Sequence, residues 1–273
     1  MDLDKYWHNI TISNTYVSPE KRRFFISIFP GLSTILYYVR ILGFINVESM
    51  AARKGVFDRL RWAESSLRIL KMIESVGGKV NISGLKEIQS RQSPFVYVAN
   101  HMSMIDTFIL PCITLRLGNV TYVLKEGLLK YPFFSAIVKA VNPISVTRKN
   151  PREDMKIVLE KGYDLISKGY SIIIFPQTTR SSFFDVSAFN SLGVKLAKKA
   201  NVPVVPVALK TDFLRNGRIL KEIGSVIPSR TVFLKFGKPI SVEGNGHVAH
   251  RQVVKFIAEN LRSWGAEVIN YSF

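Results

Sequence analysis

Short hydrophobic segments alternate with longer amphipathic ones along most of the chain. The short segments have the length and the β-branched composition of strands, and we expect strands near residues 80–82, 95–99, 121–124, 144–146, 171–175, 202–209 and 231–236. The longer segments repeat hydrophobic residues at helical spacing, which predicts helices near residues 105–117, 128–140, 151–167, 189–199 and 249–264. Strands that alternate with helices indicate an α/β fold, here an α/β sandwich around a largely parallel sheet.

Proline, asparagine and glycine refine two of these elements. The helix at 151–167 has Asn150 as a suitable N-cap, Pro151 at its first position and Gly169 just beyond its end. The strand at 202–209 contains Pro203 and Pro206. Because proline has no N–H to donate to a β ladder, we expect this strand to be an edge strand or an irregular one.

The N-terminal part has a different pattern. Residues 24–39 are uncharged and include Pro30, and an apolar run continues to Val47 beyond Arg40. A membrane-spanning helix needs about 20 apolar residues, so this run is marginal in length. We expect a membrane-inserted helix, re-entrant or interfacial and kinked at Pro30, with the basic residues 21–23 at the cytoplasmic headgroups. A buried core helix is the alternative.

A second N-terminal segment, residues 56–73, is amphipathic, with apolar residues at helical spacing and basic residues mostly elsewhere. Together the two segments predict an N-terminal membrane-anchoring helical segment over residues 1–79. Gly77 and Gly78 mark its boundary with a second domain over residues 80–273.

The balance of charged residues indicates the kind of partner that the chain binds. The chain has 38 Lys and Arg against 20 Asp and Glu, a formal net charge of +18, which predicts an anionic partner. The basic residues are spread along the whole chain, and 47% of all residues are hydrophobic. Both facts favour an anionic phospholipid membrane over nucleic acid. Cys112 is the only cysteine, which excludes a disulfide within the chain.

The segment 95–106, FVYVANHMSMID, places a polar cluster directly after a predicted strand. His101 is suited to act as a base near neutral pH, and Asp106 could fix its tautomer and stabilise the imidazolium. Residues five apart do not face each other within one regular helix. The pair can meet if His101 lies in the turn and Asp106 in the first helical turn; otherwise both are structural residues. Ser103 lacks the GxSxG surroundings of a serine nucleophile.

Three further motifs follow in order. Lys125 precedes Leu128 and Pro132, residues 175–181 have the sequence FPQTTRS, and residues 202–207 have the sequence VPVVPV. With the NHx4D motif at His101, they resemble the four blocks of the glycerolipid acyltransferase family, which includes 1-acylglycerol-3-phosphate acyltransferase. The resemblance covers about residues 80–209. It departs at position 177, where Gln replaces the usual Glu, and at position 178, where Thr replaces Gly.

The resemblance implies that residues 80–273 form an acyltransferase catalytic domain. Its reaction would move an acyl chain from acyl-CoA or acyl carrier protein to the sn-2 hydroxyl of 1-acylglycerol 3-phosphate, giving phosphatidic acid. His101 would be the base and Asp106 its partner. Substrate-binding roles are implied for Lys125, Gln177, Thr179, Arg180 and Ser181. No cofactor is needed, and His247 and His250 lack a third metal ligand nearby.

The departures at positions 177 and 178 leave the acceptor open. Another lysophospholipid or glycerol 3-phosphate is an alternative acceptor, and a non-catalytic basic membrane-binding protein is an alternative function. The basic flank and the family favour the cytoplasmic face of the bacterial inner membrane.

Overall fold

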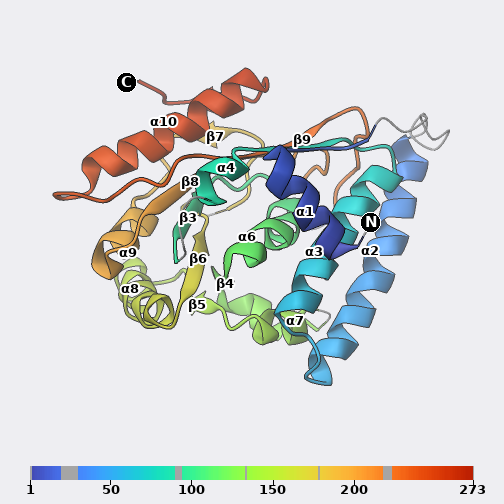
Figure 1. The fold of residues 1–273 in the computed structure, drawn as a ribbon, viewed down its shortest axis with the longest axis horizontal. Coiled ribbons are helices and arrows are strands. Elements are labelled where there is room, and N and C mark those ends of the chain that lie inside the picture. Colours follow the sequence, from blue (N-terminus) through green and yellow to red (C-terminus); the bar gives the residue numbers. More distant parts are fainter. Residues whose placement is uncertain are drawn as a thin grey trace.

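An eight-stranded sheet lies at the centre of the computed structural model, which describes residues 2–19, 30–89, 94–132, 134–177, 179–217 and 223–272 (Figure 1). Its strand order is β1-β2-β9-β8-β3-β6-β4-β5, and neighbouring strands are parallel except in the β1–β2 and β8–β9 pairs. The strands are β1 (Tyr16–Val17), β2 (Val80–Ser83), β3 (Val96–Ala99), β4 (Asn119–Lys125), β5 (Ile144–Val146), β6 (Tyr170–Ile174), β8 (Val204–Lys210) and β9 (Val232–Phe236). The predicted α/β sandwich with a largely parallel sheet is confirmed.

Helices cover both faces of this sheet. The helices are α1 (Leu3–Ser13), α2 (Pro30–Arg53), α3 (Arg59–Ser75), α4 (Leu85–Gln89), α5 (Ile105–Ile109), α6 (Pro111–Leu117), the 3-10 helix η2 (Glu126–Lys130), α7 (Ser135–Ala140), α8 (Pro151–Ser167), α9 (Leu192–Ala200) and α10 (His247–Ser263). One hydrophobic core joins α1, α2, α3 and α6 to one face, and a second joins α8, α9 and α10 to the other. A small sheet pairs β7 (Phe184–Asp185) with β10 (Val268–Ile269).

The central strand β3 shows why both cores form. Val96 and Val98 belong to the core with α8 to α10, whereas Tyr97 and Ala99 belong to the core with α1 to α3. Successive side chains of a strand point to opposite faces, so a fully apolar strand that is buried on both sides suits this central position.

Two predicted helices are interrupted, each at a proline. The expected helix 105–117 divides into α5 and α6 at Pro111, which has no N–H to continue the first helix and is the first residue of the second. The expected helix 128–140 divides into η2 and α7 around Pro132. Helix α8 has the predicted bounds, and the Asn150 side chain accepts a hydrogen bond from the Glu153 N–H at 3.3 Å.

Of the two alternatives expected for the strand with Pro203 and Pro206, the edge position is wrong and the irregular strand is confirmed. Strand β8 lies inside the sheet, between β9 and β3. The antiparallel pairing with β9 ends at Val207, and a separate bridge joins Val204 to Ile240. Pro206 lies at this interruption, where no ladder donor is required of it, and its carbonyl accepts from the Gly237 N–H at 2.9 Å. The strand is irregular on one side only.

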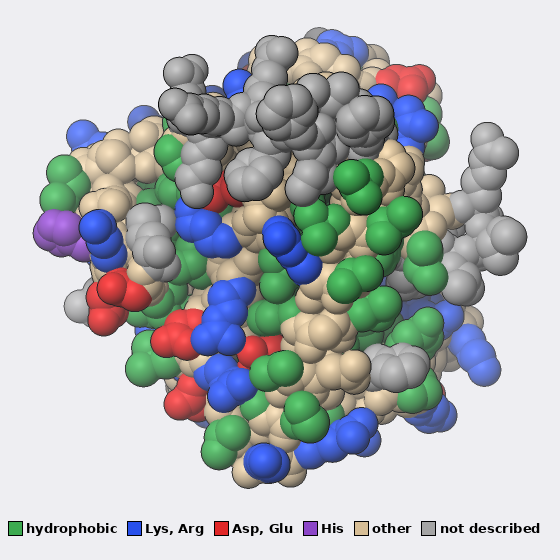
Figure 2. Space-filling model, turned by 90° about the vertical axis from the view of Figure 1, so that its right-hand side faces the viewer, with side chains coloured by type: hydrophobic (Ala, Val, Ile, Leu, Met, Phe, Trp, Pro, Cys, Tyr) green, Lys and Arg blue, Asp and Glu red, His purple; other side chains and the backbone are tan. Residues whose placement is uncertain are grey.

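Helix α2 has two different apolar faces. Tyr37, Ile41 and Ile45 are buried in the core shared with the sheet. The opposite face carries hydrophobic side chains that are between 47% and 65% exposed: Leu32, Ile35, Val39, Leu42, Val47 and Met50. Figure 2 shows this side of the molecule, with hydrophobic side chains gathered beside Lys and Arg. The helix therefore combines a core face with an apolar surface.

Within the described residues, one helical stretch, residues 31–53, is long and apolar enough to cross a membrane, and a third of its most apolar window is buried against the rest of the chain. The basic residues 21–23, the apolar residues 24–29 and the position of any kink before Pro30 lie outside the described residues. The division into an anchoring segment and a second domain near residue 79 stays a prediction.

Candidate active site

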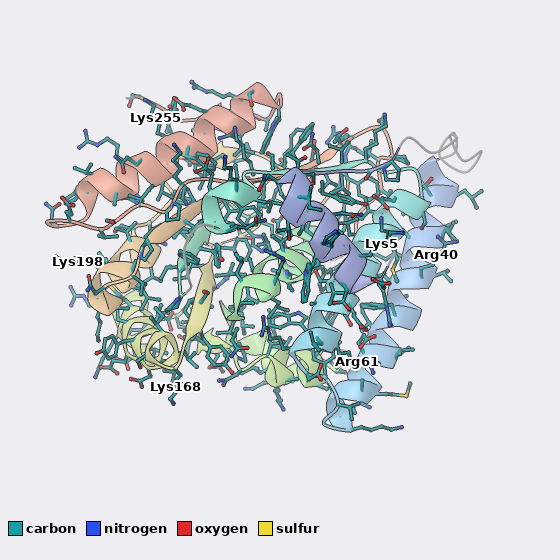
Figure 3. The ribbon with its side chains drawn as sticks, viewed as in Figure 1. Lys5, Arg40, Arg61, Lys168, Lys198 and Lys255 are labelled. Carbon is teal, nitrogen blue, oxygen red and sulfur yellow. The ribbon has the colours of Figure 1, made fainter. Side chains whose placement is uncertain are left out.

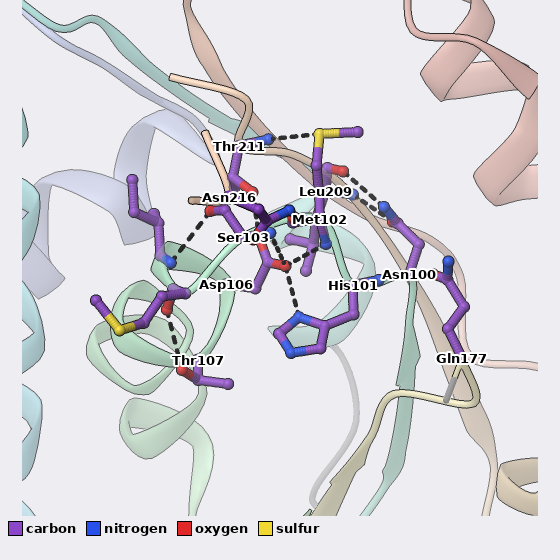
Figure 4. Close-up of polar contacts among 12 residues, drawn as sticks. Asn100, His101, Met102, Ser103, Asp106, Thr107, Gln177, Leu209, Thr211 and Asn216 are labelled. Atoms are coloured by element: carbon purple, nitrogen blue, oxygen red, sulfur yellow. Dashed lines mark hydrogen bonds and ion pairs between the residues drawn. The ribbon is translucent and has the colours of Figure 1, made fainter. Parts of the chain in front are cut away.

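The turn between β3 and α5 brings His101 and Asp106 together. Ala99 ends the strand, His101 lies in the turn, and Asp106 lies in the first turn of the helix. His101 Nδ1 is 2.8 Å from Asp106 Oδ2 (Figure 4). The five-residue spacing is thus used as the sequence predicts, by a turn followed by a helix.

The Asp106 carboxylate is fully buried and is surrounded by donors. Its Oδ2 accepts from the backbone N–H of Met102 at 2.6 Å and of Ser103 at 3.0 Å, and its Oδ1 accepts from the hydroxyl of Thr211. A carboxylate has no proton to donate, so His101 Nδ1 carries the proton in this contact. The neutral imidazole then has its lone pair on Nε2, the arrangement of a general base.

Aromatic rings fix the plane of the imidazole. The ring of His101 stacks on Phe175, with centroids 4.4 Å apart and an interplanar angle of 23°. Phe175 is in turn nearly parallel to Tyr122, with centroids 6.2 Å apart. The His101 side chain is 16% exposed, so a narrow part of it remains accessible.

The backbone of His101 is held by the segment that follows β6. The side-chain oxygen of Gln177 accepts from the His101 N–H at 2.7 Å, and the Ser181 N–H donates to the His101 carbonyl at 3.0 Å. Gln177 is buried, with 7% exposure. Only an acceptor is needed at this contact, so the amide of Gln satisfies it without a charge. Binding of substrate by Gln177, Thr179 and Ser181 stays a prediction.

Cationic side chains follow two other strands at the same edge of the sheet. Arg180 lies shortly after β6 and is half-buried, and Lys125 ends β4 and is exposed. Thr178 lies outside the described residues. Because β3, β4 and β6 are parallel, His101, Arg180 and Lys125 all lie at the carboxyl edge, where ligands gather in such sheets.

Arg148 is a further cation that the sequence analysis missed. It follows β5 with φ of 61°, and the backbone N–H groups of Thr147 and Arg148 donate to Asp154 at 2.8 and 2.7 Å. Burial lowers the pKa of Arg148, Asp154 opposes this, and the charge of Arg180 lowers the pKa further. Two guanidinium groups close enough to interact form a site suited to an anion. A basic residue two positions after a predicted strand was the available signal.

Three hydrogen bonds account for the remaining polar residues of the first motif. The Asn100 side chain donates to the Leu209 carbonyl at 2.7 Å and accepts from the Leu209 N–H at 2.8 Å, which joins β3 to β8. Ser103 is buried and its hydroxyl donates to Thr211 at 2.9 Å. Ser103 therefore serves the turn, and its surroundings do not favour a nucleophile.

This chain is similar to known acyltransferases. The family model described as Acyltransferase matches residues 79–210. The chloroplastic 1-acyl-sn-glycerol-3-phosphate acyltransferase of Arabidopsis thaliana is 29% identical over 198 residues, which are 71% of this chain and 52% of that protein. The 1-acyl-sn-glycerol-3-phosphate acyltransferase of Pseudomonas aeruginosa is 26% identical over 208 residues, 76% of this chain and 75% of that protein. The chain thus spans about half the length of the plant relative.

A solved structure shares the fold. The crystal structure of the 1-acyl-sn-glycerophosphate acyltransferase of Thermotoga maritima matches with a TM-score of 0.64 and 21% identity, over 91% of this chain and all of that chain. At this identity the likeness establishes the architecture. The four motifs in their order, the His101–Asp106 pair and the family match over residues 79–210 are features that this chain shares with the acyltransferase family, and together they support an acyltransferase enzyme.

Proposed function

We propose that this chain transfers a fatty acyl group from acyl-CoA or acyl carrier protein to the sn-2 hydroxyl of 1-acylglycerol 3-phosphate and so forms phosphatidic acid. The observation that carries the proposal is His101, whose Nδ1 is held by the buried Asp106 at 2.8 Å and whose Nε2 can take a proton. The names of the plant and bacterial relatives support the choice of acceptor.

The reaction needs no covalent enzyme intermediate. His101 Nε2 takes the proton of the acceptor hydroxyl while the hydroxyl oxygen forms a bond to the thioester carbonyl carbon. The tetrahedral intermediate collapses as the C–S bond breaks, and the imidazolium returns the proton to the leaving thiolate. Asp106 stabilises the imidazolium between these steps through its hydrogen bond to Nδ1.

The acceptor phosphate is bound by Arg180 and Arg148, with Lys125 as a further cation. Guanidinium groups bind phosphate through paired hydrogen bonds, and their mutual repulsion is relieved when an anion lies between them. The uncharged Gln177 supports this role, because the segment that carries Arg180 has one negative charge fewer than the family pattern with Glu.

The membrane partner is an anionic phospholipid surface, at the cytoplasmic face of the bacterial inner membrane. Helix α2 buries one face against the protein and exposes the other as an apolar surface, a pattern suited to a helix lying in one leaflet. Its buried Glu48, 2.7 Å from Arg61, supports this orientation, because a helix surrounded by lipid would expose that charge. Figure 3 shows Arg40 and Arg61 on the side of the molecule formed by α2 and α3, and Lys168, Lys198 and Lys255 on the opposite side of the view.

The experiment is acyl transfer in liposomes. Labelled acyl-CoA and acyl carrier protein are offered with a panel of lysophospholipids and glycerol 3-phosphate, using the wild type, His101→Ala and Arg180→Ala. Transfer to 1-acylglycerol 3-phosphate that His101→Ala abolishes supports the proposal. The Arg180→Ala variant should lose this acceptor selectively, because the phosphomonoester is its ligand.

Two outcomes contradict the proposal. Transfer to a different acceptor, with none to 1-acylglycerol 3-phosphate, would reassign the substrate to another lysophospholipid or to glycerol 3-phosphate. Folded protein that binds vesicles but transfers to no acceptor would identify a non-catalytic membrane-binding protein.

A further inference from the structure

The residue directly after β8 lies against the buried carboxylate of the candidate site. Thr211 is fully buried, and its hydroxyl donates to Asp106 Oδ1. The same hydroxyl accepts from Ser103 at 2.9 Å. Thr211 is 105 residues from Asp106 in the sequence and lies beyond the last of the four motifs.

We propose that Thr211 is a positioning residue for the acyl transfer, holding the Asp106 carboxylate in the plane that keeps the proton of His101 on Nδ1. This inference rests on the proposed function for its kinetic test. Nothing in the four sequence motifs assigns a role to this position.

The geometry supports a requirement for the hydroxyl. Asp106 Oδ2 is shared by His101 Nδ1 and two backbone N–H groups, while Oδ1 is held by Thr211. The terminal torsion of an Asp side chain is soft, so a carboxylate held at one oxygen can rotate. Contacts at both oxygens fix the plane, and with it the line along which Oδ2 faces the imidazole.

The hydroxyl chain has a defined direction. The Ile105 N–H donates to Ser103 Oγ at 3.2 Å, Ser103 donates to Thr211, and Thr211 donates to Asp106. Each donor occupies a lone pair of the next oxygen and leaves that oxygen's proton for the following contact. In a buried site such a chain is strengthened by its low-dielectric surroundings.

The segment after β8 also holds the rest of the turn. The Asn216 side chain donates to the Met102 carbonyl at 2.9 Å, and the Thr211 N–H contacts Met102 Sδ at 3.4 Å. These contacts position the turn as a whole, whereas the Thr211 hydroxyl is the one that reaches the carboxylate. A hydroxyl-specific substitution can therefore separate the two roles.

The kinetic test compares Thr211→Val with Thr211→Ser in the liposome assay. Valine keeps the shape and removes the donor, whereas serine keeps the donor. We expect Thr211→Val to lower kcat by about 10- to 100-fold, as for loss of a hydrogen bond to a charged group, with KM changed less than about twofold. Thr211→Ser should stay within about threefold of the wild type. An unchanged kcat in Thr211→Val, or an equal loss in Thr211→Ser, overturns the proposal.

A second test needs no activity. The chain has four histidines, and the His101→Ala variant identifies which ¹⁵N-imidazole NMR signals belong to His101. With the imidazole of His101 in its neutral form, these signals report which of its nitrogens carries the proton. The wild type and Thr211→Ser should show the proton on Nδ1, and Thr211→Val a mixture of both tautomers. An unchanged tautomer in Thr211→Val overturns the proposed role of Thr211, whether or not the wild type is active. Absence of acyl transfer by the wild type would refute only the proposed function.

Thermal unfolding establishes that each variant is folded before either test. If Thr211→Val is not recovered folded, Thr211→Ala takes its place, because it removes the hydroxyl without adding bulk. The same kinetic and NMR expectations apply to it.

Discussion

Replacing Asp106 by Asn separates the two roles proposed for this carboxylate, which are to fix the tautomer of His101 and to stabilise the charge of the imidazolium. The backbone N–H groups of Met102 and Ser103 both donate to Oδ2, so the oxygen of the introduced amide must take that position and its NH₂ group the position of Oδ1. An oxygen at 2.8 Å from His101 Nδ1 still accepts its proton. The NH₂ group can donate to Thr211 Oγ1, which reverses the hydrogen bond that Thr211 makes to Oδ1 and still holds the side chain at both positions. The tautomer is therefore retained, and the negative charge is lost.

The magnitude follows from this separation. A hydrogen bond to a charged group contributes roughly 1.5–3 kcal/mol, which corresponds to about a 10- to 100-fold loss of kcat for Asp106→Asn. In a Ser-His-Asp triad the same substitution costs on the order of 10⁴, because it selects the wrong tautomer. The turn at residues 102 and 103 is what should spare this protein the larger loss.

The assay is kcat with 1-acylglycerol 3-phosphate, together with the ¹⁵N spectrum of His101. Asp106→Ala is the matched control, because it removes the oxygen as well as the charge and leaves both backbone donors unsatisfied. It should lose more activity and also lower the melting temperature. A loss beyond about 10³-fold in Asp106→Asn, or a proton on Nε2 in its spectrum, would refute the reasoning.

Two further predictions concern other parts of the chain. The double substitution Ile35→Glu and Leu42→Glu on the exposed face of α2 should reduce flotation with vesicles that contain phosphatidylglycerol, because it places charge in the apolar surface. The control Val248→Glu, at an equally exposed valine of α10, should leave flotation unchanged. Equal flotation of the wild type, the double variant and the control would contradict a docking role for α2. Burial raises the pKa of the Cys112 thiol to about 11, so the folded protein should not react with a thiol reagent at about pH 8. Unfolding in guanidinium should release one reactive thiol per chain. Rapid reaction before unfolding would show that the thiol is accessible and would contradict this prediction.

The parts of the site that could be predicted are those set by short sequence distances. His101 and Asp106 lie five residues apart, and the change from strand to helix between them is visible in the hydrophobic pattern. Their contact therefore follows from local structure. The interruption of the expected helix 105–117 at Pro111 was missed, although its cause is equally local, since the missing N–H is a property of the residue itself.

The parts that could not be predicted depend on contacts between distant segments. Thr211 reaches Asp106 from 105 residues away, and a buried threonine outside the motifs carries no sequence signal of its own. Gln177 was assigned to the site by its motif, but its contact with the His101 N–H, 76 residues away, was not predicted. The error at Pro206 has the same origin. Proline restricts the strand in which it lies, but whether that strand has a neighbour on each side is decided by where β9 returns to the sheet.

The contacts that hold His101 have a consequence for which hydroxyl oxygen of the acceptor reacts. Its ring lies against Phe175 and Asp106, and its backbone is tied to Gln177 and Ser181. The point at which a hydroxyl can lose its proton is therefore a fixed place in the molecule. If the phosphate is bound at Arg180, the distance between that guanidinium and the imidazole sets the distance between the phosphate and the hydroxyl that reacts. The acylated hydroxyl would then be selected by its distance from the phosphate, with no need for the enzyme to recognise the rest of the glycerol.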